Sequence, residues 1–169
     1  MAGEPEVWLR GTVDGFEPLL MPVVHALLQV REDLVSLAAR VADEQVWNRP
    51  GGAASIGFHI RHTGGALDRL FTYASGESLT EAQKTFLRTE GEPGSPPEGI
   101  AALVAGASAV IDRALGQLRA TSPAGLLTER RVGRAGLPST TLGLLFHAAE
   151  HSTRHAGQAI TTAKILAGS

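Results

Sequence analysis

Three of the six histidines in this 169-residue chain stand one helical turn apart, at positions 147, 151 and 155 of the stretch FHAAEHSTRHAGQ. Two histidines at positions i and i+4 of a helix are about 6 Å apart, so both rings can close around one metal ion. Histidines at i and i+8 are about 12 Å apart along the axis, so all three cannot bind the same ion. The spacing therefore predicts one ligand pair on this helix and a third ligand from another element. The remaining histidines are His25, His59 and His62.

The apolar stripe of the last helix indicates which of its histidines face inward. At about 100° per residue, His155 lies at the edge of this stripe, His151 lies about 40° further out, and His147 lies about 40° beyond that. We expect His151 and His155 to point obliquely into the protein. His147 is expected to turn toward the face that carries Glu150 and Arg154, which form a surface ion pair at i, i+4.

Two other metal-site patterns bear on these histidines. The segment HAAEH, residues 147–151, matches the H-x-x-E-H pattern of one zinc peptidase class, in which Glu150 would be the general base. Such sites commonly take a downstream carboxylate as third ligand, but the 18 residues after His151 contain no Asp or Glu. We therefore interpret this match as accidental. A di-iron carboxylate bundle requires Glu-x-x-His pairs, and the sequence has none.

The composition excludes several other classes of protein. There is no cysteine, which rules out disulfides, thiolate metal ligands and a cysteine nucleophile, so any thiol chemistry would need a thiol supplied with the substrate. The net charge of -2 argues against a nucleic-acid binder. No apolar run approaches the roughly 20 residues that cross a bilayer, and the first residues lack the features of a signal peptide. We expect a cytoplasmic protein with neither nucleic-acid nor membrane partners.

Four long segments with a 3.6-residue apolar period must position the histidines. They cover about 19–41, 56–74, 97–119 and 140–166, with Ser55 as the expected N-cap of the second and Ser139 or Thr140 as that of the last. Thr80 and Gln83 form a capping-box pattern that predicts a short extra helix near 80–87. Residues 121–138 are expected to be irregular, with a short extended piece around ERRVGRAG, and no strand alternation is long enough to predict a sheet. The sequence predicts one all-α domain over 1–169, a four-helix bundle with one short extra helix.

Two stretches carry a family resemblance: PGGAASIGFHIRHTGGALDRLFTYASGE and, further on, LLFHAAEHSTRHAGQAITTAKIL. Together they resemble the DinB-like (YfiT-like) metalloenzymes, over about residues 19–166. The resemblance implies a four-helix bundle, often a homodimer, in which three histidines hold a divalent metal, zinc or nickel. By motif, the metal ligands fall on His62, which precedes TGGALDRL, and on His151 and His155 in the H-x-x-x-H-x-G-Q segment.

The sequence departs from the family pattern at one position and conflicts with it at another. Many members have Arg directly after the last ligand, where this chain has Ala156. The periodicity of the second helix places His59 closer to the centre of its apolar stripe than His62, so the third ligand remains open between these two histidines. His25 lies off the apolar stripe of the first helix and is expected to be partly exposed rather than a fourth ligand.

The residues after the last expected ligand also match the family. For Gly157 we expect close helix packing. Gln158 is either a hydrogen-bond donor that orients a ligand imidazole or a solvated residue.

Three imidazole ligands leave at least one open coordination position, as in catalytic zinc sites. The resemblance implies a metal-dependent enzyme of the thiol-transferase or isomerase kind, acting on a small-molecule substrate with a low-molecular-weight thiol such as bacillithiol or mycothiol. Arg61, Arg69 and Arg154 are candidates for holding an acidic thiol, although each is also explained as a solvated helix charge. The alternatives are a non-catalytic, stress-related metal-binding protein and a metal-dependent hydrolase.

Overall fold

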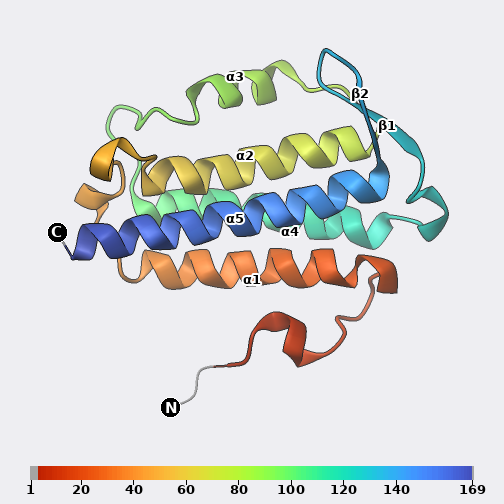
Figure 1. Cartoon of the computed structure of the whole chain (residues 1–169), viewed down its shortest axis with the longest axis horizontal. Coiled ribbons are helices and arrows are strands. Elements are labelled where there is room, and N and C mark those ends of the chain that lie inside the picture. Colours follow the sequence, from red (N-terminus) through yellow and green to blue (C-terminus); the bar gives the residue numbers. More distant parts are fainter. Residues whose placement is uncertain (1–3, 169) are drawn as a thin grey trace.

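The computed structural model describes residues 4–168, in which four long helices form a bundle. These helices are α1 (Met21–Ala38), α2 (Ile56–Ala74), α4 (Ile100–Ala120) and α5 (Thr141–Ala167). Helix α2 packs against α4 and α5, and α1 packs against the same two helices (Figure 1). The predicted all-α four-helix bundle is therefore confirmed.

The core is built from the apolar stripes that the sequence shows on each long helix. Leu27 and Leu34 of α1, Leu67 of α2 and Ile111 of α4 are fully buried at the bundle axis. Helix α5 contributes mainly small residues, and four of its alanines are buried: Ala148, Ala149, Ala156 and Ala159. Because alanine occupies little space, α5 can approach its neighbours closely along the segment that carries the histidines.

The connection between α2 and α4 crosses back along the bundle, because these two helices run in the same direction (Figure 1). The short helix α3 (Glu81–Thr89) lies within this connection and over α2. It begins with the predicted capping box, in which the Gln83 amide donates to the Thr80 hydroxyl at 3.2 Å and the Gln83 side chain accepts from the Thr80 amide at 2.9 Å. Gln83 also donates to Asp68 and Thr72 of α2, which fastens α3 to the bundle.

Two helix boundaries differ from the sequence expectation. Helix α1 ends at Ala38 rather than near residue 41. Helix α4 begins at Ile100 rather than near Pro97, because the carboxylate of Asp43 accepts a hydrogen bond from the Ile100 amide at 2.8 Å. Ser55 caps α2 as expected, and Thr140 rather than Ser139 caps α5.

A two-stranded antiparallel sheet precedes α5, formed by β1 (Glu129–Val132) and β2 (Leu137–Thr140). The sequence predicts an extended piece around ERRVGRAG, which β1 confirms, but it predicts no sheet, and that part of the expectation was wrong. The strands have four residues each, half of them exposed and the others partly exposed, and neither strand shows a sustained apolar alternation. Gly133 and Gly136 adopt φ angles of +66° and +59°, which permit the tight turn between the strands.

Among the helices of residues 4–168, α4 has the length and apolar composition that could also cross a membrane. The core helix of a bundle has the same composition, and Leu103, Ile111 and Leu118 of α4 are buried against the other helices. Bundle packing therefore accounts for the apolar character of α4.

Candidate metal centre

His62, His151 and His155 meet where α2 packs against α5. One ring nitrogen from each histidine lies within 4.8 Å of the corresponding atoms of the other two. Nε2 of His62 lies 2.9 Å from Nε2 of His151, and the ring centroids of His62 and His155 are 4.5 Å apart. Nitrogen ligands about 2 Å from a tetrahedral ion are separated by about 3.3 Å, so small ring movements would fit this group to a divalent ion.

Helix α5 presents its histidines to different environments. His151 and His155, at i and i+4, are half-buried and belong to the histidine group. The side chain of His147 is 52% exposed, and its Nδ1 lies 3.4 Å from Glu150 Oε2 on the outer face of the helix. His151 and His155, which the helical periodicity predicts to face inward, therefore lie together in the structure. His147 lies outside the group.

A buried carboxylate holds His62 from behind. Glu90 Oε1 accepts a 2.6 Å hydrogen bond from Nδ1 of His62, and Glu90 Oε2 accepts one from the Arg69 guanidinium at 3.1 Å. Burial raises the pKa of Glu90, but the hydrogen bond from His62 and the charge of Arg69 outweigh this effect and lower the pKa overall. The ionised carboxylate thus keeps the His62 proton on Nδ1 and leaves the lone pair of Nε2 directed at the other histidines.

Neither Glu90 nor the buried state of Arg69 was predicted from the sequence. Glu90 follows the end of α3, 28 residues after His62, and no spacing rule connects the two. Arg69 was expected either to hold a thiol or to be a solvated charge, but it is only 8% exposed and pairs with Glu90. Arg69 shares its face of α2 with the polar residues His62 and Thr72, so the apolar pattern of the helix gave no signal of a buried partner.

His59 is also buried, at 7% exposure, but it lies behind His155 rather than within the group of three. Its Nδ1 lies 3.0 Å from Nδ1 of His155, so one ring donates a hydrogen bond to the other. The apolar stripe of α2 thus indicated correctly that His59 is more buried than His62, although burial does not bring it into the cluster.

The protonation states of the histidines suit metal binding. Burial lowers the pKa of His155 to about 4, and the nearby charges of His62 and His151 contribute in the same direction. Burial and the charge of His62 also lower the pKa of His151. Both rings are therefore neutral at pH 7, the form in which imidazole binds a metal ion.

Two further contacts bear on the fit of an ion. Nδ1 of His151 is buried and has no hydrogen-bond partner among residues 4–168, so a ring that binds an ion through Nε2, the atom that faces His62, would have to pair Nδ1 with a water. The ring of Phe58 stacks on that of His62, with the centroids 5.2 Å apart, and restricts its orientation. Neutral imidazoles that converge within 4.8 Å, with an ionised carboxylate behind one of them, fit a divalent cation.

The other charged residues considered in the sequence are engaged in ion pairs. Arg61 donates to Glu98 through Nε and Nη2, at 2.9 and 2.6 Å. The predicted surface pair of Glu150 and Arg154 is present, at 2.6 Å. Glu150 is exposed on α5, so it does not face the histidine group as a peptidase general base would.

The remaining family-matched positions have mixed outcomes. A Cβ atom on Gly157 would meet nothing within 4 Å, so the expectation of close helix packing there was wrong. Gln158 is exposed, as the solvated alternative requires. His25 is partly exposed, as expected, and its Nε2 lies 2.9 Å from the carbonyl oxygen of Gly11, outside the histidine group.

A four-helix bundle with three clustered histidines on two of its helices is the architecture of a helical metal-binding protein. The DinB superfamily matches residues 26–159, and the chain belongs to this superfamily, whose members bind divalent metals. The chain is also similar to a solved structure described as the conserved protein of locus from Enterococcus faecalis, with a TM-score of 0.69 and 16% sequence identity over 89% of this chain and 98% of that chain. At that identity the likeness shows a shared fold alone. No curated protein matches the chain.

Proposed function

We propose that the chain is a divalent-metal-dependent enzyme of the thiol-transferase or isomerase kind, with zinc or nickel held by His62, His151 and His155. The observation that carries this proposal is the convergence of three imidazole nitrogens within 4.8 Å, backed by Glu90. The His62 side chain is 18% exposed, so a substrate can reach the group from solvent. Three protein ligands with access to solvent are typical of catalytic rather than closed structural zinc sites.

The chain's own residues would hold and orient the ligands. Glu90 fixes the tautomer of His62, Phe58 restricts its ring, and His59 restrains the ring of His155. The ion, when bound, would supply the positive charge that keeps a thiol or water deprotonated near neutral pH. Because the chain has no cysteine, a thiol would have to come with a small-molecule cosubstrate of the bacillithiol or mycothiol type.

A second candidate is a metal-binding protein without turnover. This candidate is favoured because the three arginines that could hold an acidic thiol, Arg61, Arg69 and Arg154, are each already paired with a carboxylate. A transferase would need to open one of these pairs or to bind its thiol through other groups.

Elemental analysis combined with a thiol-consumption assay distinguishes the candidates. The enzyme proposal requires about one zinc or nickel ion per chain and consumption of thiol with an electrophilic substrate, abolished in His151→Ala and retained in His147→Ala. A bound ion without consumption across a broad set of thiols and electrophiles supports the non-catalytic protein. Failure to bind any divalent ion contradicts both.

We also propose a homodimer, on the family resemblance alone. Light scattering should then return about twice the 17.7 kDa of one chain. A single-chain mass at all accessible concentrations would contradict it.

A further inference from the structure

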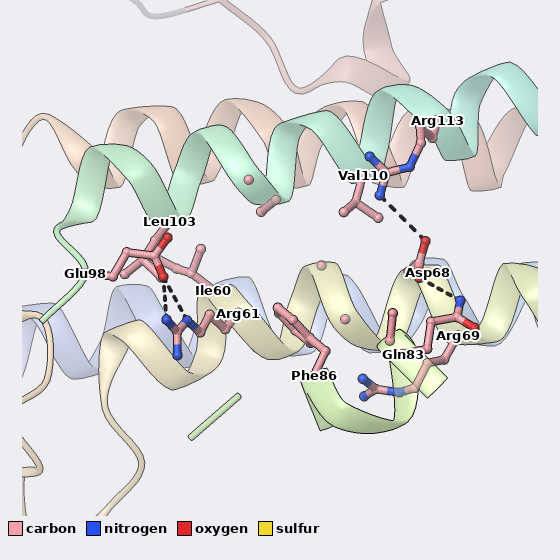
Figure 2. Close-up of a pocket in the computed structure, with 15 residues that line it drawn as sticks. Ile60, Arg61, Asp68, Arg69, Gln83, Phe86, Glu98, Leu103, Val110 and Arg113 are labelled. Carbon is pink, nitrogen blue, oxygen red and sulfur yellow. Dashed lines mark hydrogen bonds and ion pairs between the residues drawn. The ribbon is translucent and has the colours of Figure 1, made fainter. Parts of the chain in front are cut away.

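A hollow of about 330 Å³ lies between α2, α3 and α4 (Figure 2), and His62, His151 and His155 are not among the residues that line it. We call it the α2–α4 hollow. Its volume is within the range of sites that bind small molecules. Most of its wall is apolar and is formed by Ile60, Phe86, Leu103, Ala107 and Val110.

The room in the hollow comes from glycines at its wall. Gly64 and Gly65 of α2 and Gly106 of α4 line it without side chains. A Cβ atom on Gly65 would lie 2.6 Å from the ring of Phe86, so this ring can cover the hollow only because residue 65 is glycine. A Cβ atom on Gly106 would meet nothing within 4 Å. The hollow is thus an open apolar space beneath Phe86.

The charged side chains around the hollow differ in how strongly they are bound to partners of opposite charge. Arg61 and Glu98 close one end with two short hydrogen bonds, and Arg69 is buried against Glu90. At the other end, Arg113 lies 3.6 Å from Asp68, and its side chain is 63% exposed (Figure 2). Arg113 therefore carries the least restrained positive charge at the edge of the hollow.

At the end of the hollow near Arg113, the carboxylate of Asp68 is held more tightly by its partners than the Arg113 guanidinium is. Asp68 Oδ2 accepts a 2.6 Å hydrogen bond from Gln83, while its Oδ1 faces Arg113. A cationic ligand would have to displace these donors from Asp68. An anion would instead gain a guanidinium, which can bind a carboxylate or sulfonate through two parallel N–H groups.

We propose that the α2–α4 hollow binds a small molecule with an apolar body of about two rings and one anionic group, which Arg113 holds at the rim. The size follows because a cavity of about 150 Å³ accommodates one benzene ring. The three clustered histidines do not line this site, although Arg69 in its wall pairs with Glu90. The proposal does not depend on the function proposed for the histidine group.

The probes are 8-anilinonaphthalene-1-sulfonate and its sulfonate-free analogue N-phenyl-1-naphthylamine, titrated by fluorescence against the full chain. Gly106→Leu places a side chain in the open space of the hollow and should weaken binding of both probes by about tenfold or more. Gly116→Leu is the matched control, because Gly116 is also exposed on α4, does not line the hollow and has nothing within 4 Å of a Cβ position. Equal affinity in the two leucine variants, or no saturable binding to the wild-type chain, would overturn the proposal.

Two further variants test the anionic group and the location. Arg113→Gln should weaken binding of the sulfonate probe about fivefold and leave the neutral probe unchanged, since exposed charge pairs contribute at most about that much. Arg88→Gln, at an exposed arginine of α3 that does not line the hollow, should change neither. Unchanged sulfonate binding in Arg113→Gln would contradict the anion contact. His151→Ala must retain the sulfonate probe, and its loss there would place the probe at the histidine group instead.

Discussion

Two histidine–glutamate contacts in the protein use the same chemical groups in opposite surroundings. His62 and Glu90 are 2.6 Å apart, with side chains 18% and 6% exposed, and they join α2 to the end of α3. His147 and Glu150 are 3.4 Å apart, with side chains 52% and 41% exposed, and they lie within one turn of α5. The first contact lies behind the histidine group, whereas the second lies on the surface.

A motif locates residue types, but the burial of those residues decides which contacts they make. Glu150 stands in the conspicuous H-x-x-E-H pattern, yet it pairs with Arg154 in solvent, where charges are screened. Glu90 belongs to no motif, yet it is buried between His62 and Arg69, where an electrostatic contact is much stronger and an unpaired group is costly.

The largest expected difference between the two regions is in metal content. His155→Ala removes one of three proposed ligands and should abolish stable metal binding, while His147→Ala should retain about one ion per chain. Elemental analysis after dialysis measures both, and circular dichroism checks that the helices remain. If His147→Ala loses the metal and His155→Ala keeps it, the pair lies one turn earlier and the H-x-x-E-H interpretation must be reopened.

The same measurement distinguishes His62 from His59. His62→Ala should behave like His155→Ala, because its Nε2 faces the other two rings. His59→Ala should weaken binding without abolishing it, since His59 contacts the group only through His155. Complete loss of metal in His59→Ala, with retention in His62→Ala, would show that His59 is the third ligand and that His62 is not.

A smaller effect is expected from the carboxylates themselves. Glu90→Gln removes the charge behind His62 and should weaken metal affinity by about 10- to 100-fold. Competition with a chromophoric chelator measures this change. Glu150→Gln is the matched control on the exposed contact and should leave the affinity unaltered. Equal effects of the two substitutions would show that burial does not distinguish these contacts.

The pH dependence of the free energy of unfolding should also reflect the buried and half-buried histidines. The folded-state pKa values of His59, His151 and His155 lie below the usual 6.5, that of His155 at about 4, mainly because of burial. The unfolded chain therefore takes up protons first, and the free energy of unfolding should fall as the pH decreases from about 6.5 toward 4. Urea unfolding of the metal-free protein should show this decline, and it should be shallower in His155→Gln. A stability that is constant over this range would contradict the neutral state of these rings.

The elements that follow from local periodicity could be predicted, and those that follow from distant contacts could not. The apolar spacing in α2 and α5 predicted both helices, because helical geometry is set by nearby residues. The same spacing in α5 predicted that His151 and His155 point inward. His62 came from the family resemblance, since the periodicity alone favoured His59. Glu90 could not be found, because it reaches His62 only after the chain has crossed back over α2.

The same limit explains the boundary of α4, where the carboxylate of Asp43 caps Ile100 from 57 residues away. It also explains the α2–α4 hollow. Gly64, Gly65 and Gly106 are unfavourable residues inside a helix, but the sequence does not show the space that they leave, which forms only when α2, α3 and α4 are packed together.

The smallest expected effect is on the folding stability contributed by the exposed contact. Glu150 is solvent-exposed and pairs with Arg154 within one helix, so Glu150→Gln should shift the melting temperature of the metal-free protein by about 1 °C or less. Glu90→Gln leaves Arg69 buried opposite a neutral amide and should lower the free energy of unfolding by about 3–5 kcal/mol. Thermal and urea unfolding of both variants, prepared without metal, measure the effect on folding stability alone. The effect of Glu90 on the orientation of His62 as a metal ligand does not enter this measurement. A Glu150→Gln protein as destabilised as Glu90→Gln would mean that the surface pair of α5 is held as rigidly as the buried one, and the contrast between the two regions would then fail.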